Sequence, residues 1–291
     1  MGLGYDTSNE WQILGDYSNN YVNNYGHRMK AKAQISTTEK NVIASYEIPG
    51  RNPGTTSNSF ALGYTNLKEN HNQKSNAIKI TISHKLRNFK STVTTSLNAL
   101  KERYNLTARS NTTANMLYPS IHWSYKSQPF SNSFLSQGFN ISTNVAGTIK
   151  ALSQQSDFIQ ASFSARFLKT FFNQNTRLLA RTSAATTYID KMDNLPLSMQ
   201  LFAGGPGSIR GYHFHELPEN NTLGRNMITA SIELQQRLYG QIYLAGFIDA
   251  GNVTNSQTLF TDMKSAAGLG FAVVSLIGTF ELTAAKPINK D

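Results

Sequence analysis

One arginine and two carboxylates in the last third of the 291-residue chain have side chains suited to a buried ion-pair cluster. Arg210 lies in a glycine-rich segment, and Glu233 and Asp249 lie in the two alternating segments that follow it. A guanidinium is planar and permanently charged, so it can bind carboxylates through paired hydrogen bonds in a geometry that lysine cannot reproduce. We predict that Arg210 acts as a latch on Asp249 and Glu233; the alternative is that each is an independent charge in a wet interior.

The polar and apolar alternation around the two carboxylates places them on one face. Glu233 shares its parity with three polar residues, which are Thr229, Ser231 and Gln235. Asp249 follows Ile248, which shares its parity with the apolar Ile242 and Leu244. Successive side chains of a strand point to opposite faces, so both carboxylates are predicted to point to the polar side.

Other reactive combinations in the sequence have simpler interpretations. The segment Gly204–Gly211 lacks the Lys-Ser/Thr and the following helix of a phosphate-binding loop. His213 and His215 have no third ligand nearby for a metal, and four acidic residues in the same region are expected to be solvated: Asp190, Asp193, Glu216 and Glu219. The chain has no Ser-His-Asp order. We therefore expect no catalytic site, no metal and no cofactor.

The composition favours a protein that spans a membrane with strands. Hydrophobic residues are 39% of the chain, aromatic residues 11% and charged residues only 15%. No apolar run approaches the about 18 residues that a membrane helix needs, and the best stretch is Ile242–Ile248. A closed β-barrel is the other structure that satisfies its backbone in lipid. We predict an all-β, transmembrane antiparallel β-barrel with a lipid-facing and a wet face.

The net charge is +10, with a sequence pI of about 9.7. Scattered interior and loop Lys and Arg account for this charge most simply; contact with lipopolysaccharide phosphates or with acidic clients is the alternative. Along the chain the Lys and Arg residues never cluster beyond three in five positions, and no nucleic-acid motif is present. The chain has no cysteine, so it has no disulfide and no thiolate site.

Alternation with period two predicts fifteen strands and no helix. Their predicted ranges are 1–5, 11–18, 27–36, 40–48, 58–67, 77–86, 90–101, 115–125, 137–144, 158–168, 176–187, 227–237, 241–249, 265–275 and 278–286. Single-chain bacterial barrels have even strand numbers, so we expect sixteen strands in the complete protein, with the last one beyond residue 291. Met1 is followed by no signal peptide, so the exported protein is expected to begin upstream.

One connection, between about Thr187 and Met227, breaks this rhythm. Connections of about forty residues without alternation are uncommon and usually functional. Its centre runs from Leu201 to Tyr212 and is rich in glycine, so its backbone can approach a wall closely. Long barrel loops lie on the outer side. We expect this connection to start on the outer side and to fold back into the barrel.

The motifs of this region resemble the BamA/TamA superfamily, also called the bacterial surface antigen family. Gly204-Gly205 followed by Ile209-Arg210-Gly211-Tyr212 is similar to the sixth-loop signature of that family. The stretch with Phe247, Asp249 and Gly251 is similar to its Phe-x-Asp-x-Gly strand, and Gly2-Leu3-Gly4-Tyr5 to its first barrel strand. The resemblance extends over the whole chain and is nearest to the TamA translocation and assembly branch.

The resemblance implies a bacterial outer-membrane barrel that inserts or secretes client proteins. In such proteins the seam between the first and last strands, here beginning at Gly2–Tyr5, opens as a lateral gate. The implied partners are client outer-membrane or secreted proteins, outer-membrane lipid or lipopolysaccharide, and periplasmic or inner-membrane proteins that bind upstream POTRA domains. Residues 1–291 would form the barrel domain, with the POTRA domains and the final strand outside this chain. A two-partner secretion pore, a passive porin or adhesin, and a soluble all-β binding protein are the alternatives.

Overall fold

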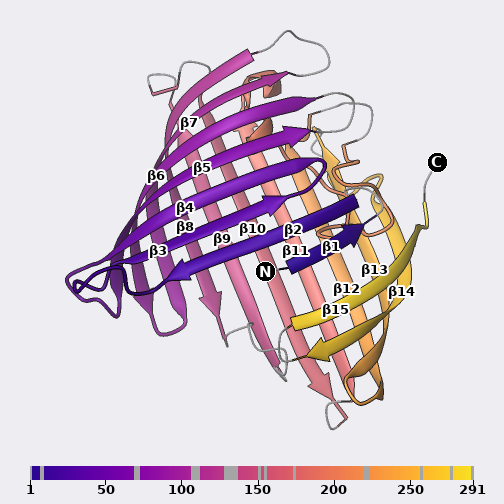
Figure 1. Cartoon of the computed structure of the whole chain (residues 1–291). Helices are drawn as coiled ribbons and strands as arrows, with labels where there is room; N and C mark the ends of the chain where they lie inside the picture. Colours follow the sequence, from indigo (N-terminus) through magenta and orange to yellow (C-terminus); the bar gives the residue numbers. More distant parts are fainter. Residues whose placement is uncertain are drawn as a thin grey trace. The chain divides into compact units, whose positions relative to one another are not determined.

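The computed structural model has fifteen strands in one antiparallel sheet, each hydrogen-bonded to the next strand along the chain (Figure 1). It describes residues 2–6, 10–68, 73–105, 112–127, 137–149, 152–153, 156–172, 175–218, 223–255, 258–275 and 278–289. The strands are β1 (Gly2–Asp6), β2 (Glu10–Asn19), β3 (Arg28–Ile35), β4 (Glu39–Pro49), β5 (Thr56–Lys68), β6 (Lys74–Asn88), β7 (Ser91–Asn105), β8 (Thr112–Lys126), β9 (Gln137–Thr148), β10 (Phe158–Phe171), β11 (Thr176–Ile189), β12 (Asn226–Tyr239), β13 (Ile242–Thr254), β14 (Lys264–Ser275) and β15 (Gly278–Pro287).

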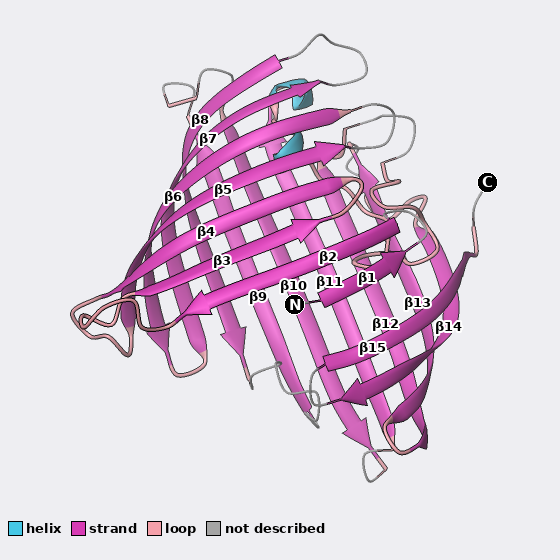
Figure 2. Ribbon diagram, viewed as in Figure 1, coloured by secondary structure: helices cyan, strands magenta, loops and turns pink. Residues whose placement is uncertain are grey.

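All fifteen predicted strands are confirmed, and several are longer than predicted. The strand predicted over 137–144 continues to Thr148, and the one predicted over 115–125 begins at Thr112. Helical structure in the described ranges is limited to two single turns, η2 (Met192–Asn194) and η3 (Leu197–Met199), shown in cyan in Figure 2. None of the described helices is long and apolar enough to cross a membrane.

Burial is inverted relative to a water-soluble sheet. On β12, Ile232 is 61% exposed and its neighbour Glu233 only 7%. On β13, Ile248 is 60% exposed and Asp249 is fully buried. These two strands therefore have an apolar face that is exposed and a polar face that is covered, which is the arrangement expected of a strand with one face in lipid. We call these two sides the apolar face and the polar face.

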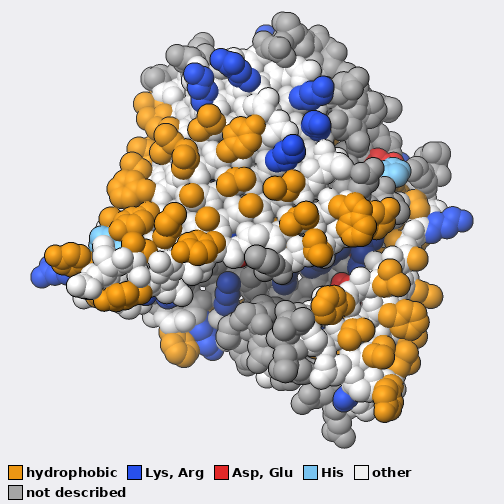
Figure 3. All heavy atoms as spheres, viewed as in Figure 1, with side chains coloured by type: hydrophobic (Ala, Val, Ile, Leu, Met, Phe, Trp, Pro, Cys, Tyr) orange, Lys and Arg blue, Asp and Glu red, His pale blue; other side chains and the backbone are white. Residues whose placement is uncertain are grey.

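The chain divides into two compact parts. The first part contains Met1–Trp123, Asn144–Ala161 and Thr187–Gln200, and the second contains Ser124–Thr143, Ser162–Thr186 and Leu201–Asp291. In the first part, long continuous ladders join β4, β5, β6 and β7. Their apolar face carries a band of hydrophobic side chains (Figure 3). The second part contains the ladders from β11 to β15, on which the candidate site is built.

Two side chains make contacts between segments that are distant along the chain. Tyr118 is only 4% exposed and packs its ring on Phe158, because it lies on the covered face of β8. Lys32 lies opposite Asp16 in the ladder and forms an ion pair with it at 3.7 Å. Both interactions are non-local, so alternation alone could not reveal them.

Candidate functional site

The glycine-rich tip of the long connection folds into a compact turn. The N–H of Gly205 donates to the carbonyls of both Ile209 and Tyr212, at 3.1 and 3.0 Å. The N–H of Gly204 donates to Oγ of Ser208 at 2.7 Å. Gly204, Gly205 and Gly211 have φ values of 117°, 89° and 94°, a region that glycine adopts without steric cost. The turn thereby presents Arg210 to the polar face of the sheet.

Arg210 binds the two carboxylates that the sequence predicted. Its Nε donates to Oδ2 of Asp249 at 2.8 Å and its Nη2 to Oδ1 at 2.9 Å, so the guanidinium binds this carboxylate bidentately. Its backbone N–H also donates to Oδ2 of Asp249, at 2.9 Å. Nη1 donates to Glu233, and Nη2 to Oγ of Ser231 at 3.1 Å. The register pairs Ser231 with Asp249, which explains why adjacent strands present these groups together.

The cluster is shielded from solvent. The Arg210 side chain is 11% exposed, that of Glu233 9%, and that of Asp249 is fully buried. Burial by itself lowers the pKa of the Arg210 guanidinium, but hydrogen bonds to Asp249 and Glu233 outweigh burial and raise that pKa above its ordinary value. Arg210 therefore remains charged, and charged hydrogen bonds in such surroundings are among the strongest that proteins form.

A second arginine, which the sequence reasoning missed, supports the tip from β11. Arg181 donates to the carbonyls of Pro206 and Ser208, at 2.9 and 3.3 Å. It also lies 3.7 Å from Oδ2 of Asp249. The ladder pairs Arg181 with Ser231, so it is on the same polar face as the cluster. The signal available in the sequence was the position of Arg181 in the predicted strand 176–187, where the alternation places its side chain on the polar face.

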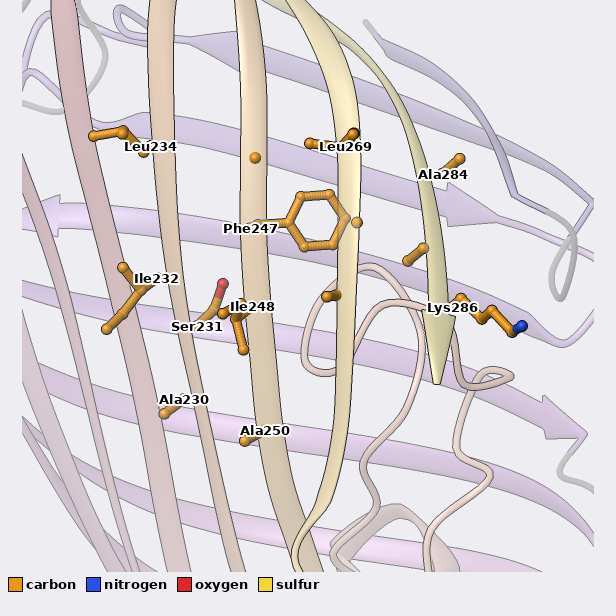
Figure 4. A pocket seen from close by; sticks show the side chains of 14 residues that line it. Ala230, Ser231, Ile232, Leu234, Phe247, Ile248, Ala250, Leu269, Ala284 and Lys286 are labelled. Atoms are coloured by element: carbon orange, nitrogen blue, oxygen red, sulfur yellow. The ribbon is translucent and has the colours of Figure 1, made fainter. Parts of the chain in front are cut away.

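The Phe247 ring forms the floor beneath the guanidinium. The guanidinium carbon of Arg210 lies 3.3 Å from the ring centroid, in a cation–π contact. Phe247 is paired with Gly268 on β14, and a Cβ at Gly268 would lie 2.3 Å from Cζ of the ring. Figure 4 shows the ring reaching beside β14. Gly268 therefore provides the space that the ring occupies.

Small residues surround the same position on the apolar face. A groove of about 1040 Å³ lies over β12–β15, and its small lining residues include Ala230, Gly246, Ala250, Ala267, Gly268 and Ala284. Ile232, Ile248 and Leu269 project beside them (Figure 4). The apolar face of the strands that carry the arginine cluster is therefore lined by many small side chains.

The remaining motif residues pack the tip against the wall. Ile209 and Tyr212 are buried in one apolar cluster with four residues of the loop and wall: Ala203, Leu217, Val253 and Ala266. A Cβ at Gly251 would lie 2.8 Å from Cδ1 of Ile209, so this glycine makes room for the isoleucine. Gly211 packs on Ala266 and Ala285. The motif of the connection, Gly204–Tyr212, thus packs against the motif of β13, Phe247–Gly251.

The first half of the long connection has its own anchor in the first part of the molecule. Glu102 on β7 is fully buried, and its carboxylate accepts from Oγ of Ser75 at 2.6 Å and from the backbone N–H of Ser198 at 3.0 Å. The Ser198 hydroxyl also donates to Glu102. Leu195 and Leu197, in the same segment as Ser198, are fully buried. The sequence reasoning missed Glu102; its polar-face parity on β7 was the only signal.

The predicted first strand forms one end of the sheet order. Gly2, Leu3, Gly4 and Tyr5 pair with β2 alone among the described strands. Leu3 is 79% exposed and Tyr5 63%, and both point to the apolar face. These residues belong to the first part of the chain, whereas Arg210, Glu233 and Asp249 belong to the second.

The described residues contain no group of three His, Cys, Asp or Glu side chains placed to hold a metal ion. His215 stacks on Phe202 and Phe214, with ring centroids 5.0 and 3.7 Å apart. His213 is exposed, and its backbone N–H donates to Glu216. Glu219 lies outside the described residues.

The replacement Gly268→Ala is expected to destabilise the cluster, because the new Cβ would clash with the Phe247 ring and with the Ala284 carbonyl 2.4 Å away. Overpacking of this kind costs typically about 1–3 kcal/mol. Gly246→Ala is the matched control, since its Cβ would meet only Leu269, at 3.4 Å. Heat-modifiable gel migration of the folded protein should shift to lower temperature for Gly268→Ala alone; equal shifts would remove the packing argument.

Comparison with solved structures shows the fold. BamA from Haemophilus ducreyi lacking POTRA domains 1–3 matches with a TM-score of 0.82 at 15% identity, over 99% of this chain and 66% of that one. CdiB from Escherichia coli matches at 0.65 and 15%, over 98% and 57%. CdiB from Acinetobacter baumannii matches at 0.63 and 11%, over 99% and 55%. The chain thus spans less than two thirds of the length of each.

The Omp85 superfamily domain matches residues 23–291, which is most of the chain. Together with the fifteen-stranded antiparallel sheet, this match confirms the predicted superfamily, the outer-membrane β-barrel fold and the bacterial outer membrane as its location. The nearness to the TamA branch stays a prediction. The chain belongs to the Omp85 superfamily.

Proposed function

We propose that this barrel inserts or translocates client proteins at the outer membrane, and that it does so without enzymatic chemistry. The observation that carries the proposal is the arginine cluster: Arg210, Asp249 and Glu233 hold a long connection on the polar face of strands β11–β13. A passive channel requires no buried, bidentate fixation of one loop. We therefore assign Arg210 the role of a latch that keeps the connection in its working position.

The client is proposed to engage the edge of β1. Gly2–Tyr5 form a short strand with one partner in the described sheet, and an unpaired edge can bind an extended segment by strand addition. Gly2 and Gly4 leave little side-chain bulk on the polar face of this edge. The free energy of client folding then drives insertion. Periplasmic or inner-membrane partners would act through POTRA domains outside this chain.

Site-specific photo-crosslinking tests this proposal. A photoreactive residue in place of Leu3, in the full-length protein within outer membranes, should crosslink to a nascent client barrel. The same residue in place of Leu97, which is also exposed on the apolar face but lies within the sheet on β7, should not. Equal crosslinking at both positions would contradict a gate at β1. Steady ion conductance without any client crosslink would indicate a porin, and a crosslinked client that is released outside would indicate a secretion pore.

A further inference from the structure

Five basic side chains gather at one end of the apolar face of β4–β7, and all five are exposed: Lys40, Lys68, Lys74, Lys101 and Arg103. Their positions in the alternation of each strand place these five side chains on the apolar face. On β6, Lys74 alternates with the buried Ser75 and shares its side with Ile78 and Ile80, which are 51% and 53% exposed. On β7, Lys101 and Arg103 flank the buried Glu102. These are charges on a hydrophobic surface, where charge is normally avoided.

The ladder registers bring the five together. Lys68 pairs with Lys74, Asn76 with Arg103, and Ile78 with Lys101. Lys40 pairs with Asn66, which in turn pairs with Asn76. Directly opposite residues of neighbouring strands have Cβ atoms about 5 Å apart and diagonal ones about 7–8 Å. Figure 3 shows Lys and Arg side chains grouped beside the hydrophobic band. We call these five residues the basic patch.

No acidic side chain balances the basic patch on this face of the described strands β4–β7. Glu39, Glu47 and Glu102 all point to the polar face, where they bind Gln34, Lys85 and Ser75 respectively. The opposite end of the same apolar face carries no Lys or Arg within these strands; its residues include Ile48, Asn58 and Leu86. Lysines that merely reach for water would not favour one end, so the asymmetry requires a cause.

The basic patch lies at the end of the strands where the long connection begins. Tyr104, near the end of β7, donates its hydroxyl to the carbonyl of Asp193 in that connection. We expect the long connection to start on the outer side, since long barrel loops lie outside, and this end of the strands is then the outer one. The neighbouring lipid then belongs to the outer leaflet, and a phosphorylated head group is the anion at that depth.

We propose that the basic patch binds the phosphates of a multiply phosphorylated glycolipid of the outer leaflet, while the adjoining band of Ile78, Ile80 and Ile82 contacts its acyl chains. The amides of Asn66, Asn76 and Asn105 lie among the charges and complete the polar surface. The proposal rests on the proposed orientation and function only for which leaflet faces the patch. The charge and its location stand independently of client insertion.

Binding of bisphosphorylated lipid A to the purified full-length protein in detergent tests the proposal. Each basic residue near an anionic surface contributes about fivefold to affinity, so Lys74→Gln/Arg103→Gln should weaken binding about 30-fold. Arg51→Gln/Lys90→Gln is the matched control, because it removes one Arg and one Lys from exposed turns at the other end of the strands. The charge-preserving exchange Lys74→Arg/Arg103→Lys should bind like the native protein, which excludes a folding defect.

Equal loss in the two glutamine variants would overturn the proposal, because net charge alone would then explain binding. Equal affinity for lipid A lacking both phosphates would overturn it as well, since only the apolar band would matter. Client insertion into vesicles of phosphatidylethanolamine and phosphatidylglycerol, measured in parallel, separates the two proposals. The Lys74→Gln/Arg103→Gln variant should insert clients normally there. A native protein that binds lipid A but inserts no client would refute the proposed function and leave the lipid site standing.

Discussion

Replacing Arg210 by alanine is expected to abolish most client insertion while the barrel still folds. The change removes the bidentate cation of the buried Asp249 carboxylate and the cation that binds Glu233, and leaves Asp249 only the more distant Arg181, at 3.7 Å. Removing one partner of a buried ion pair costs about 3–5 kcal/mol. The wall strands keep their ladder, so release of the loop tip is the cheapest response. Insertion of a client into outer membranes and protease access to residues 201–217 measure the two consequences in the full-length protein.

A double-mutant cycle distinguishes a latch from independent charges. Asp249→Ala should impair insertion as much as Arg210→Ala, and the double variant should be little worse than either, because both remove one interaction. Arg210→Lys should also fail largely, since an ammonium cannot hold both carboxylate oxygens and lie flat on Phe247. Arg225→Ala in the same connection is the control, because Arg225 binds the side-chain amide of Asn255 and not a carboxylate of the arginine cluster. Additive single defects, or full rescue by lysine, would refute the latch.

Glu102→Gln is expected to free the first half of the connection selectively. The carboxylate accepts from Ser75 and twice from Ser198, and an amide group would turn one acceptor into a donor facing these donors. Hydrogen bonds to a charged group contribute about 1.5–3 kcal/mol each, so amide hydrogen exchange in 190–200 should accelerate at least about tenfold. Ser198→Ala should have a smaller effect, because its backbone N–H still binds Glu102.

Exchange in the second half of the connection is the internal reference for this experiment. Residues 203–217 are held by the arginine cluster and by their own apolar cluster, so their protection should persist in Glu102→Gln. Conversely, Arg210→Ala should leave 190–200 protected. If either replacement deprotects both halves together, the connection is a single cooperative unit and the two anchors are not independent.

The sequence predicted the strands well because one face of each meets lipid and the other does not. As a result, apolar and polar residues alternate clearly in segments such as 77–86 and 227–237. The boundaries were less accurate where alternation weakens: residues 145–148, Val-Ala-Gly-Thr, continue β9 with small side chains that carry little contrast. The two single turns η2 and η3 are three residues each, too short to show a periodicity, although Leu195 and Leu197 in this segment are buried.

The arginine cluster could be predicted from two features of the sequence: the face to which each strand residue points, and the order of the three residues along the chain. Asp249 and Glu233 lie on consecutive strands with polar-face parity, and Arg210 is in the connection before them. Arg181 and Glu102 were missed for one physical reason: their partners include backbone groups of the connection, 25 to 96 residues away along the chain. No local pattern records such a contact. Gly268 was likewise visible only as a small residue until its register with Phe247 was known.

The pairing of Phe247 with Gly268 has an evolutionary consequence. A Cβ at position 268 and a ring at position 247 cannot occupy the same space, so neither site can drift alone. Among homologous barrels, a larger residue at the position of Gly268 should occur only where the aromatic at 247 has become smaller, and the flat support under the arginine would be lost with it. Substitutions at positions 247 and 268 should therefore be correlated among homologues, although the two positions are 21 residues apart along the chain. Homologues in which this pair is replaced should also have lost the arginine.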